Sequence, residues 1–171
     1  MNSASLLRIV ASVLGLWSLA APWAAAFPSR PDHYKATLFG VRHVLDMSAT
    51  SAQSECYWGD DEEPCQAAAG AETKFKLLTA ARWFMLAALA ILFAASGRFR
   101  HSATRVSWLY VGAALAGASA IVLFEGNVAA ALAVFDGARV EPRGTGAIAA
   151  IASTMLAAAA GGLASWRSRS A

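Results

Sequence analysis

Two cysteines, Cys56 and Cys65, are the residues of this sequence with the clearest capacity for chemistry. They are the only cysteines in 171 residues, and a Gly-Asp-Asp turn pattern and further acids separate them. Such a turn favours a hairpin, and a disulfide could join its two arms. In the chain-entropy picture, closing a loop of about ten residues contributes roughly 2 to 3 kcal/mol to stability. We therefore predict a structural disulfide between Cys56 and Cys65.

Metal binding and redox catalysis are the alternative roles for this region. Two cysteines do not by themselves make a zinc site, and His33 and His43 lack ligand spacing. The acids at 60–63 lack the alternating spacing of a calcium loop, so a solvated hairpin tip is the simpler interpretation. A quinone-linked thiol oxidase needs a closely spaced cysteine pair of low thiol pKa, usually with a second pair. We predict no catalytic residue, no metal and no cofactor, and keep the thiol oxidase as an alternative.

The composition indicates a membrane protein. Hydrophobic residues make up 57% of the chain and charged residues only 15%, which is unusual for a soluble domain of this size. A helix that crosses a hydrocarbon core of about 30 Å needs roughly 20 apolar residues. Four segments meet this requirement, at residues 6–26, 76–96, 106–124 and 145–166. A further apolar run at 128–135 could extend the third helix beyond the bilayer.

The first apolar segment could instead be a cleaved signal peptide. Arg8, the apolar run after it and the three alanines at 24–26 imitate the parts of such a peptide. The run is longer than most signal-peptide cores, so we expect a retained helix. Pro22 and Trp23 then mark its outer end, where an aromatic side chain sits well in the membrane interface.

The distribution of charge predicts the orientation. The amino terminus, the turn at 97–105 and the tail carry no acid, and their arginines are Arg8, Arg98, Arg100, Arg105, Arg167 and Arg169. All 11 acids lie in the other connecting segments. By the positive-inside rule, both termini are cytoplasmic and the segments 27–75 and 125–144 are external, in the plasma (inner) membrane. The net charge of +3 therefore reflects topology, and we expect no nucleic-acid partner.

The first external segment has strand-like and loop-like parts. Residues 34–44 mix aromatic, branched and polar side chains as strands do, whereas 48–54 is typical of a loop. We predict two to four short strands in this segment, because a lone hairpin is marginal in water. Aromatic and acidic residues there form the candidate interaction surface: Phe39, Tyr57, Trp58, Asp60, Asp61, Glu62 and Glu63.

Arg82 is a charged residue inside the second apolar segment. A charge costs about 2.5 to 3.5 kcal/mol at mid-bilayer and less near an interface, so Arg82 should lie near the outer boundary and face protein. One interpretation is a ligand or ion pathway. We favour a structural clamp, in which Arg82 joins the external sheet to the helices through carbonyls or an acid.

Several of these motifs together resemble the claudin and peripheral-myelin-protein superfamily of four-helix membrane proteins. Pro22-Trp23 at the end of the first helix is similar to the family's Pro-x-Trp, and Cys56 and Cys65 have its Cys-x8-Cys spacing. The stretch from Thr79 to Arg82 resembles the family's Ala-Arg-Ala-Leu at the start of helix two. A short inner turn, a shorter second external loop and a fourth helix complete the order.

The chain also departs from that family. The Gly-Leu-Trp before the first cysteine is missing, with Leu38-Phe39-Gly40 as the nearest equivalent, and the tail lacks the motif that claudins offer to cytoplasmic scaffolds. The resemblance implies a left-handed four-helix transmembrane bundle, an all-α membrane fold, beneath a small external antiparallel sheet. Because the tail motif is missing, the resemblance extends to the fold and not to the junction-forming role.

Two non-enzymatic functions fit these features. The first is an interaction protein whose external loops associate with other membrane proteins or with its own copies, in the same or a facing membrane. The second is an accessory subunit that stabilises a larger channel, transporter or respiratory complex. Membrane lipids are expected partners in both cases, and a small-molecule substrate is not expected.

Overall fold

The structure is a computed structural model that describes residues 3–29, 32–44, 53–57, 72–96, 103–132, 140–142 and 144–169. Its helices are α1 (Ser3–Ala20), α2 (Glu72–Ser96), α3 (Ala103–Leu132) and α4 (Thr145–Arg169). Its strands are β1 (Ala24–Ser29), β2 (Asp32–Ala36), β3 (Gly40–Val44), β4 (Gln53–Tyr57) and β5 (Val140–Pro142). The prediction of a mostly helical chain with a small antiparallel sheet is confirmed at this level.

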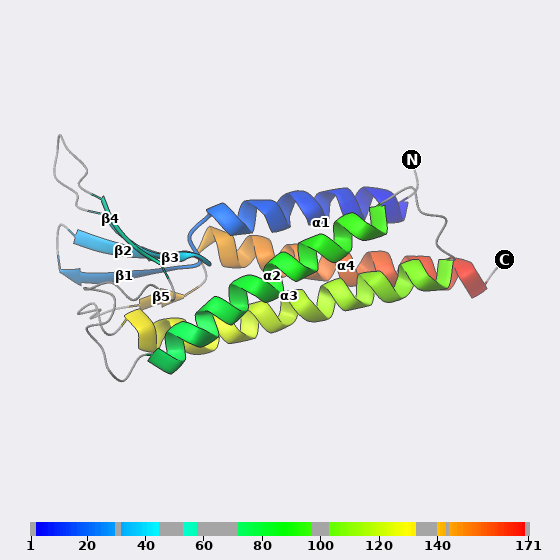
Figure 1. The fold of residues 1–171 in the computed structure, drawn as a ribbon. Helices are drawn as coiled ribbons and strands as arrows, with labels where there is room; N and C mark the ends of the chain where they lie inside the picture. Colours follow the sequence, from blue (N-terminus) through cyan, green and yellow to red (C-terminus); the bar gives the residue numbers. More distant parts are fainter. Residues whose placement is uncertain are drawn as a thin grey trace.

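The four helices lie side by side, and the sheet lies at one end of them (Figure 1). Helix α1 packs mainly against α4, α4 also against α3, and α3 against α2, whereas α1 and α2 touch over a small area. The first residues of α1 and the last residues of α4 lie at the end away from the sheet (Figure 1). The described ends of the chain are therefore on one side of the molecule.

Small residues allow α3 and α4 to approach closely. A Cβ placed on Gly117 of α3 would lie 2.5 Å from Oγ1 of Thr154 in α4. The Ser107 hydroxyl of α3 donates a hydrogen bond to the carbonyl of Gly161 in α4, at 3.1 Å. Close approach through glycine and interhelical hydrogen bonds from serine are typical of helix pairs within membranes.

Serine also joins α4 to α1. The buried Ser153 hydroxyl of α4 donates a hydrogen bond to the Ala11 carbonyl of α1, at 2.7 Å. Ala11 and Ala157 are fully or almost fully buried in the same apolar cluster. An interhelical hydrogen bond of this kind contributes about 0.6 kcal/mol on average within a bilayer, and the packed alanines add to the contact of α1 with α4.

Three of the described helices are long and apolar enough to cross a membrane. Their apolar parts are Lys76–Ala95, Val106–Ala130 and Thr145–Trp166. The corresponding part of α1 is shorter, at Ser5–Ala20. The chain is thus suited to a membrane, as its composition predicts.

The predicted first helix at 6–26 is too long at its carboxyl-terminal end. Helix α1 ends at Ala20, and the three alanines at 24–26 belong to strand β1. Pro22 has no backbone N–H and disfavours helical geometry in the residue before it, so the helix ends there. The 18 residues of α1 span about 27 Å, whereas the 30 residues of α3 span about 45 Å.

The sheet has five antiparallel strands in the order β4-β3-β2-β1-β5. Strand β5 pairs with β1, with Ala24 opposite Pro142 and Ala26 opposite Val140. The sheet was predicted within 27–75 alone, and this is wrong because β5 comes from the second connecting segment. The predicted loop at 48–54 is also wrong at its end, since β4 begins at Gln53. One sheet therefore joins the two segments that were expected to be external.

Two glycines of α3 provide a test of this helix packing. We expect Gly117→Ala to destabilise the protein by about 1 to 3 kcal/mol, because the new methyl group overlaps the Thr154 side chain. Gly112→Ala is the matched control, since a Cβ there meets nothing within 4 Å. It should be neutral or stabilise by up to about 1 kcal/mol through helix propensity. Unfolding of both variants in mild detergent checks this, and equal midpoints would contradict the close α3–α4 packing.

Candidate functional site at the helix–sheet junction

Trp23 is the centre of the contact between the helices and the sheet. Its side chain is 1% exposed, and its indole Nε1–H donates a hydrogen bond to the Ser18 carbonyl at 2.7 Å. Its ring lies 4.8 Å from that of Phe124 in α3, centroid to centroid, in a tilted arrangement. We call Ser18, Trp23, Ala36, Phe124, Gly144 and Gly146 the Trp23 junction.

The backbone on either side of Trp23 satisfies polar groups of the sheet and of α4. The Trp23 N–H donates to the Ala36 carbonyl at 2.7 Å, which continues the pairing of β1 with β2. The Trp23 carbonyl accepts a hydrogen bond from Gly144 at 2.7 Å, and the Pro22 carbonyl accepts one from Gly146 at 2.8 Å. Because the first N–H groups of a helix have no partner within the helix, these two bonds cap the start of α4.

Glycine is required where α4 meets this segment. A Cβ on Gly146 would lie 2.5 Å from the Ala21 carbonyl oxygen and 2.6 Å from Cδ1 of Trp23. Neither a backbone carbonyl nor a buried indole ring moves easily. The Gly-x-Gly at the start of α4 therefore lets the helix end contact the Pro22–Trp23 backbone directly.

The turn between β2 and β3 inserts into the helices at the same level. Leu38 is fully buried in one apolar cluster with Trp23, Leu78 and Phe124. The Thr37 Oγ1 accepts hydrogen bonds from the N–H groups of Phe39 and Gly40, each at 3.2 Å. This side-chain turn fixes the conformation that directs Leu38 into the cluster.

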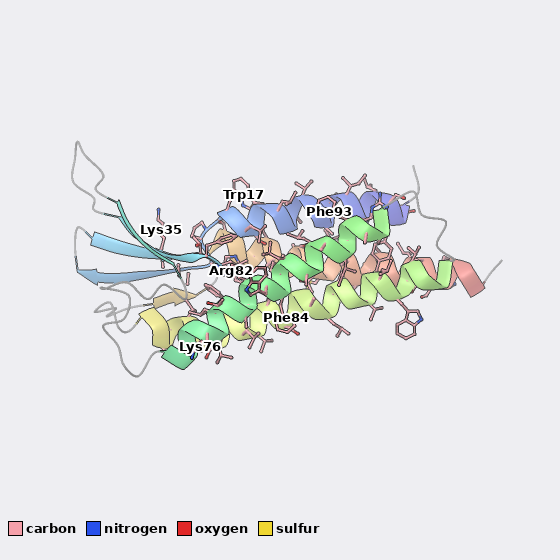
Figure 2. The ribbon with its side chains drawn as sticks, viewed as in Figure 1. Trp17, Lys35, Lys76, Arg82, Phe84 and Phe93 are labelled. Atoms are coloured by element: carbon pink, nitrogen blue, oxygen red, sulfur yellow. The ribbon has the colours of Figure 1, made fainter. Side chains whose placement is uncertain are left out.

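Arg82 of α2 lies at the edge of this turn. Its guanidinium carbon is 5.7 Å from the ring centroid of Phe39 and 5.4 Å from that of Trp83. Figure 2 shows Arg82 where α2 passes the end of the sheet. Arg82 is half-buried, and Phe39 packs against the apolar cluster beneath it. A cation over an aromatic face is attracted by the ring quadrupole, so the contact with Phe39 joins α2 to the turn between β2 and β3, whereas Trp83 is the next residue of α2 itself.

No family model matches this chain, and neither does any curated protein. The resemblance to claudins is therefore an inference from the motifs quoted above. The function is inferred from the residues and their geometry.

Of the predicted site residues, the structure brings Arg82 and Phe39 together. Cys56 lies in β4, where its Cα is paired with that of Val41 in β3. Cys65 lies outside the described residues, so its disulfide with Cys56 remains a prediction. Tyr57 ends β4. The remaining members of the candidate interaction surface also lie outside the described residues: Trp58, Asp60, Asp61, Glu62 and Glu63.

Sequence reasoning missed the role of Trp23 and its glycine partners. Trp23 was expected in the membrane interface, but it is buried between helices and sheet. A Pro-Trp pair just after an apolar run, with Gly-x-Gly just before another, was the available signal. Among the described residues, no group of three or more His, Cys, Asp or Glu side chains could hold a metal ion.

The Trp23 hydrogen bond can be tested with one tryptophan variant and one control. Trp23→Phe should destabilise the protein by about 1 to 3 kcal/mol, because the buried Ser18 carbonyl loses its indole donor. Trp17→Phe is the control, since Trp17 is 61% exposed and such changes usually stay within about 0.5 kcal/mol. Thermal unfolding in one detergent measures both, and equal stability would contradict the central role of Trp23.

The contact between Arg82 and Phe39 predicts an energetic coupling. In a double-mutant cycle with Arg82→Gln and Phe39→Leu, we expect a coupling of about 0.5 to 1 kcal/mol. A cycle between Arg82→Gln and Leu6→Ala, an exposed residue near the start of α1 at the end away from the sheet (Figure 1), should show coupling near zero. Denaturant unfolding of the purified variants provides the values. Additive effects of Arg82 and Phe39 would mean that the stacking contributes nothing to stability.

Proposed function

We propose that this chain is a claudin-like integral membrane protein whose external sheet associates with other membrane proteins or with its own copies. In this proposal the four helices form a left-handed transmembrane bundle. The protein is not an enzyme, and its activity is binding. The sheet end faces outward and both termini are cytoplasmic.

The exposed surface of the helices supports a membrane environment. Each helix carries large apolar side chains that no other part of the described structure covers, such as Leu16, Phe84, Leu115 and Met155. Burying this many exposed groups requires a hydrocarbon phase or a partner surface. The lengths of the apolar parts of α2, α3 and α4 suit a bilayer.

Exposed tryptophans support a particular depth in the bilayer. Trp17 and Trp83 belong to the parts of α1 and α2 near the sheet, whereas Trp108 and Trp166 belong to the opposite ends of α3 and α4. Trp108 precedes the junction residue Phe124 by 16 residues, or about 24 Å of helix. Trp166 follows Gly146 by 20 residues, or about 30 Å. These rises place Trp108 and Trp166 about one hydrocarbon thickness away from the junction, near which Trp17 and Trp83 lie, so the exposed tryptophans fit the two interfaces of a bilayer.

Charge supports the orientation. The arginines on the cytoplasmic side in this proposal include Arg8 in α1 and Arg167 in α4, far from the sheet. The described strands carry acids as well as bases, for example Glu55 in β4 and Glu141 in β5. The excess of arginine at the end opposite the sheet favours a cytoplasmic location for that end.

The observation that carries the proposed binding role is the attachment of a five-stranded sheet to the helix ends. The Trp23 junction connects β1, β2, α3 and α4 through hydrogen bonds and ring packing. A surface held in one conformation before binding loses little entropy when a partner docks. A preorganised external sheet is thus suited to recognition, whereas no catalytic group is needed for it.

Purification of the tagged full-length protein in mild detergent tests this proposal. We expect native mass spectrometry to find a homo-oligomer, or a complex with another membrane protein in fixed stoichiometry. Peptide mapping with and without reductant should find Cys56 bridged to Cys65. Cys56→Ser is expected to lower thermal stability by roughly 2 to 3 kcal/mol, the contribution of closing such a loop.

The outcomes separate the candidate functions. A defined oligomer supports self-association, and one larger complex of constant composition supports the accessory-subunit function. A lone monomer whose two cysteines are oxidised by added quinone in a catalytic cycle would overturn the proposal in favour of a thiol oxidase.

A further inference from the structure

Arg82 has hydrogen-bonding capacity that the described protein does not use. A guanidinium has five N–H donors and no acceptor. Its contacts in the described part of the chain are the faces of Phe39 and Trp83, and no carboxylate or carbonyl there accepts a hydrogen bond from it. Aromatic faces attract the positive charge but leave the N–H donors at the edge of the guanidinium plane without acceptors.

The surroundings of Arg82 lie at the outer boundary of the apolar region. Arg82 is within the apolar part of α2, six residues after Lys76. Its neighbour Trp83 is 61% exposed, as is Trp17 on α1, whereas Phe39 belongs to the turn between β2 and β3. In the proposed orientation, this is the depth at which lipid headgroups meet the hydrocarbon.

We infer that Arg82 binds the phosphodiester group of a phospholipid in the outer leaflet. The planar guanidinium matches two phosphate oxygens in a bidentate arrangement, and such charge-assisted bonds are the strong ones. The phosphate supplies the acceptor oxygens that the rings of Phe39 and Trp83 lack. The exposed Trp83 ring offers an apolar surface to the lipid beside its headgroup.

A lipid also explains why a half-buried arginine is tolerated inside an apolar helix. An uncompensated charge in a spanning segment is costly, and a phosphate counter-ion lowers that cost. The rings of Phe39 and Trp83 hold the guanidinium in place, so little side-chain entropy is lost when the lipid binds. The inference rests on the proposed membrane orientation and is independent of any protein partner.

Lipid titration of the full-length protein in detergent tests the inference. Phosphatidylglycerol binding is measured by native mass spectrometry, with diacylglycerol of the same acyl chains as the phosphate-free probe. We expect Arg82→Gln to weaken phosphatidylglycerol binding about tenfold, the scale of one charge-assisted hydrogen bond. Lys35→Gln, which removes the same charge from β2 on the sheet (Figure 2), should leave binding unchanged. Equal binding by both variants would overturn the inference.

A second measurement uses only the wild-type chain, so it does not depend on the folding of a variant. An arginine-selective dicarbonyl reagent modifies the protein, and peptide mapping follows Arg82. Phosphatidylglycerol should slow modification of Arg82 about tenfold, whereas diacylglycerol should not. Protection by diacylglycerol as well, or full protection by inorganic phosphate alone, would overturn the assignment to a phospholipid. Failure of these lipid tests would leave the co-purification result unaffected.

Discussion

This structure depends on hydrogen bonds to the backbone where α1 ends and α4 begins. Both helix ends lie in an apolar region, where unpaired backbone polar groups are costly. The end of α1 leaves carbonyls without partners, and the start of α4 leaves N–H groups without partners. The Trp23 indole donates to one such carbonyl, and the backbone of Pro22 and Trp23 accepts from the start of α4. A buried amide or carbonyl without a partner costs several kcal/mol in a hydrocarbon environment. The hydrogen bonds of Pro22 and Trp23 therefore determine how the other elements meet.

The position of the sheet depends on the same backbone hydrogen bonds of Trp23. Trp23 donates to Ala36 and so continues the pairing of β1 with β2, and the hydrogen bond from Gly144 to the Trp23 carbonyl lies next to the pairing of β5 with β1. The alanines Ala24 and Ala36 are almost fully buried where the sheet meets the helices. Their small side chains allow the strands to lie close to the helix ends, and Leu38 fills the remaining space.

The existence and order of the four helices could be predicted from sequence because length and hydrophobicity decide them, although α1 ends at Ala20 and not at the predicted residue 26. Helix α2 begins at Glu72, where residue 76 was predicted, and ends at Ser96 as predicted. Helix α4 begins at Thr145 as predicted and ends at Arg169, where residue 166 was predicted. Strand β1 could not be predicted in this way, because three alanines favour a helix and only long-range pairing with β2 and β5 makes them extended. The position of Arg82 was predictable from the cost of its charge, but its aromatic neighbour Phe39 comes from a turn far along the chain. The structural role of Trp23 could not be predicted either, because its partners lie far apart in the sequence. They are Ser18, Ala36, Phe124 and Gly144.

The unequal lengths of α1 and α3 have a consequence for the surrounding bilayer. Helix α1 is about 27 Å long, slightly less than a typical hydrocarbon core of about 30 Å, and it stands in the same molecule as longer apolar helices. In the proposed orientation, lipids beside α1 must compress while lipids beside α3 need not. Such one-sided thinning costs energy in proportion to the perimeter that it affects. Two molecules that place their α1 sides together share one thinned zone, so the membrane itself favours their association and their sorting into thinner regions.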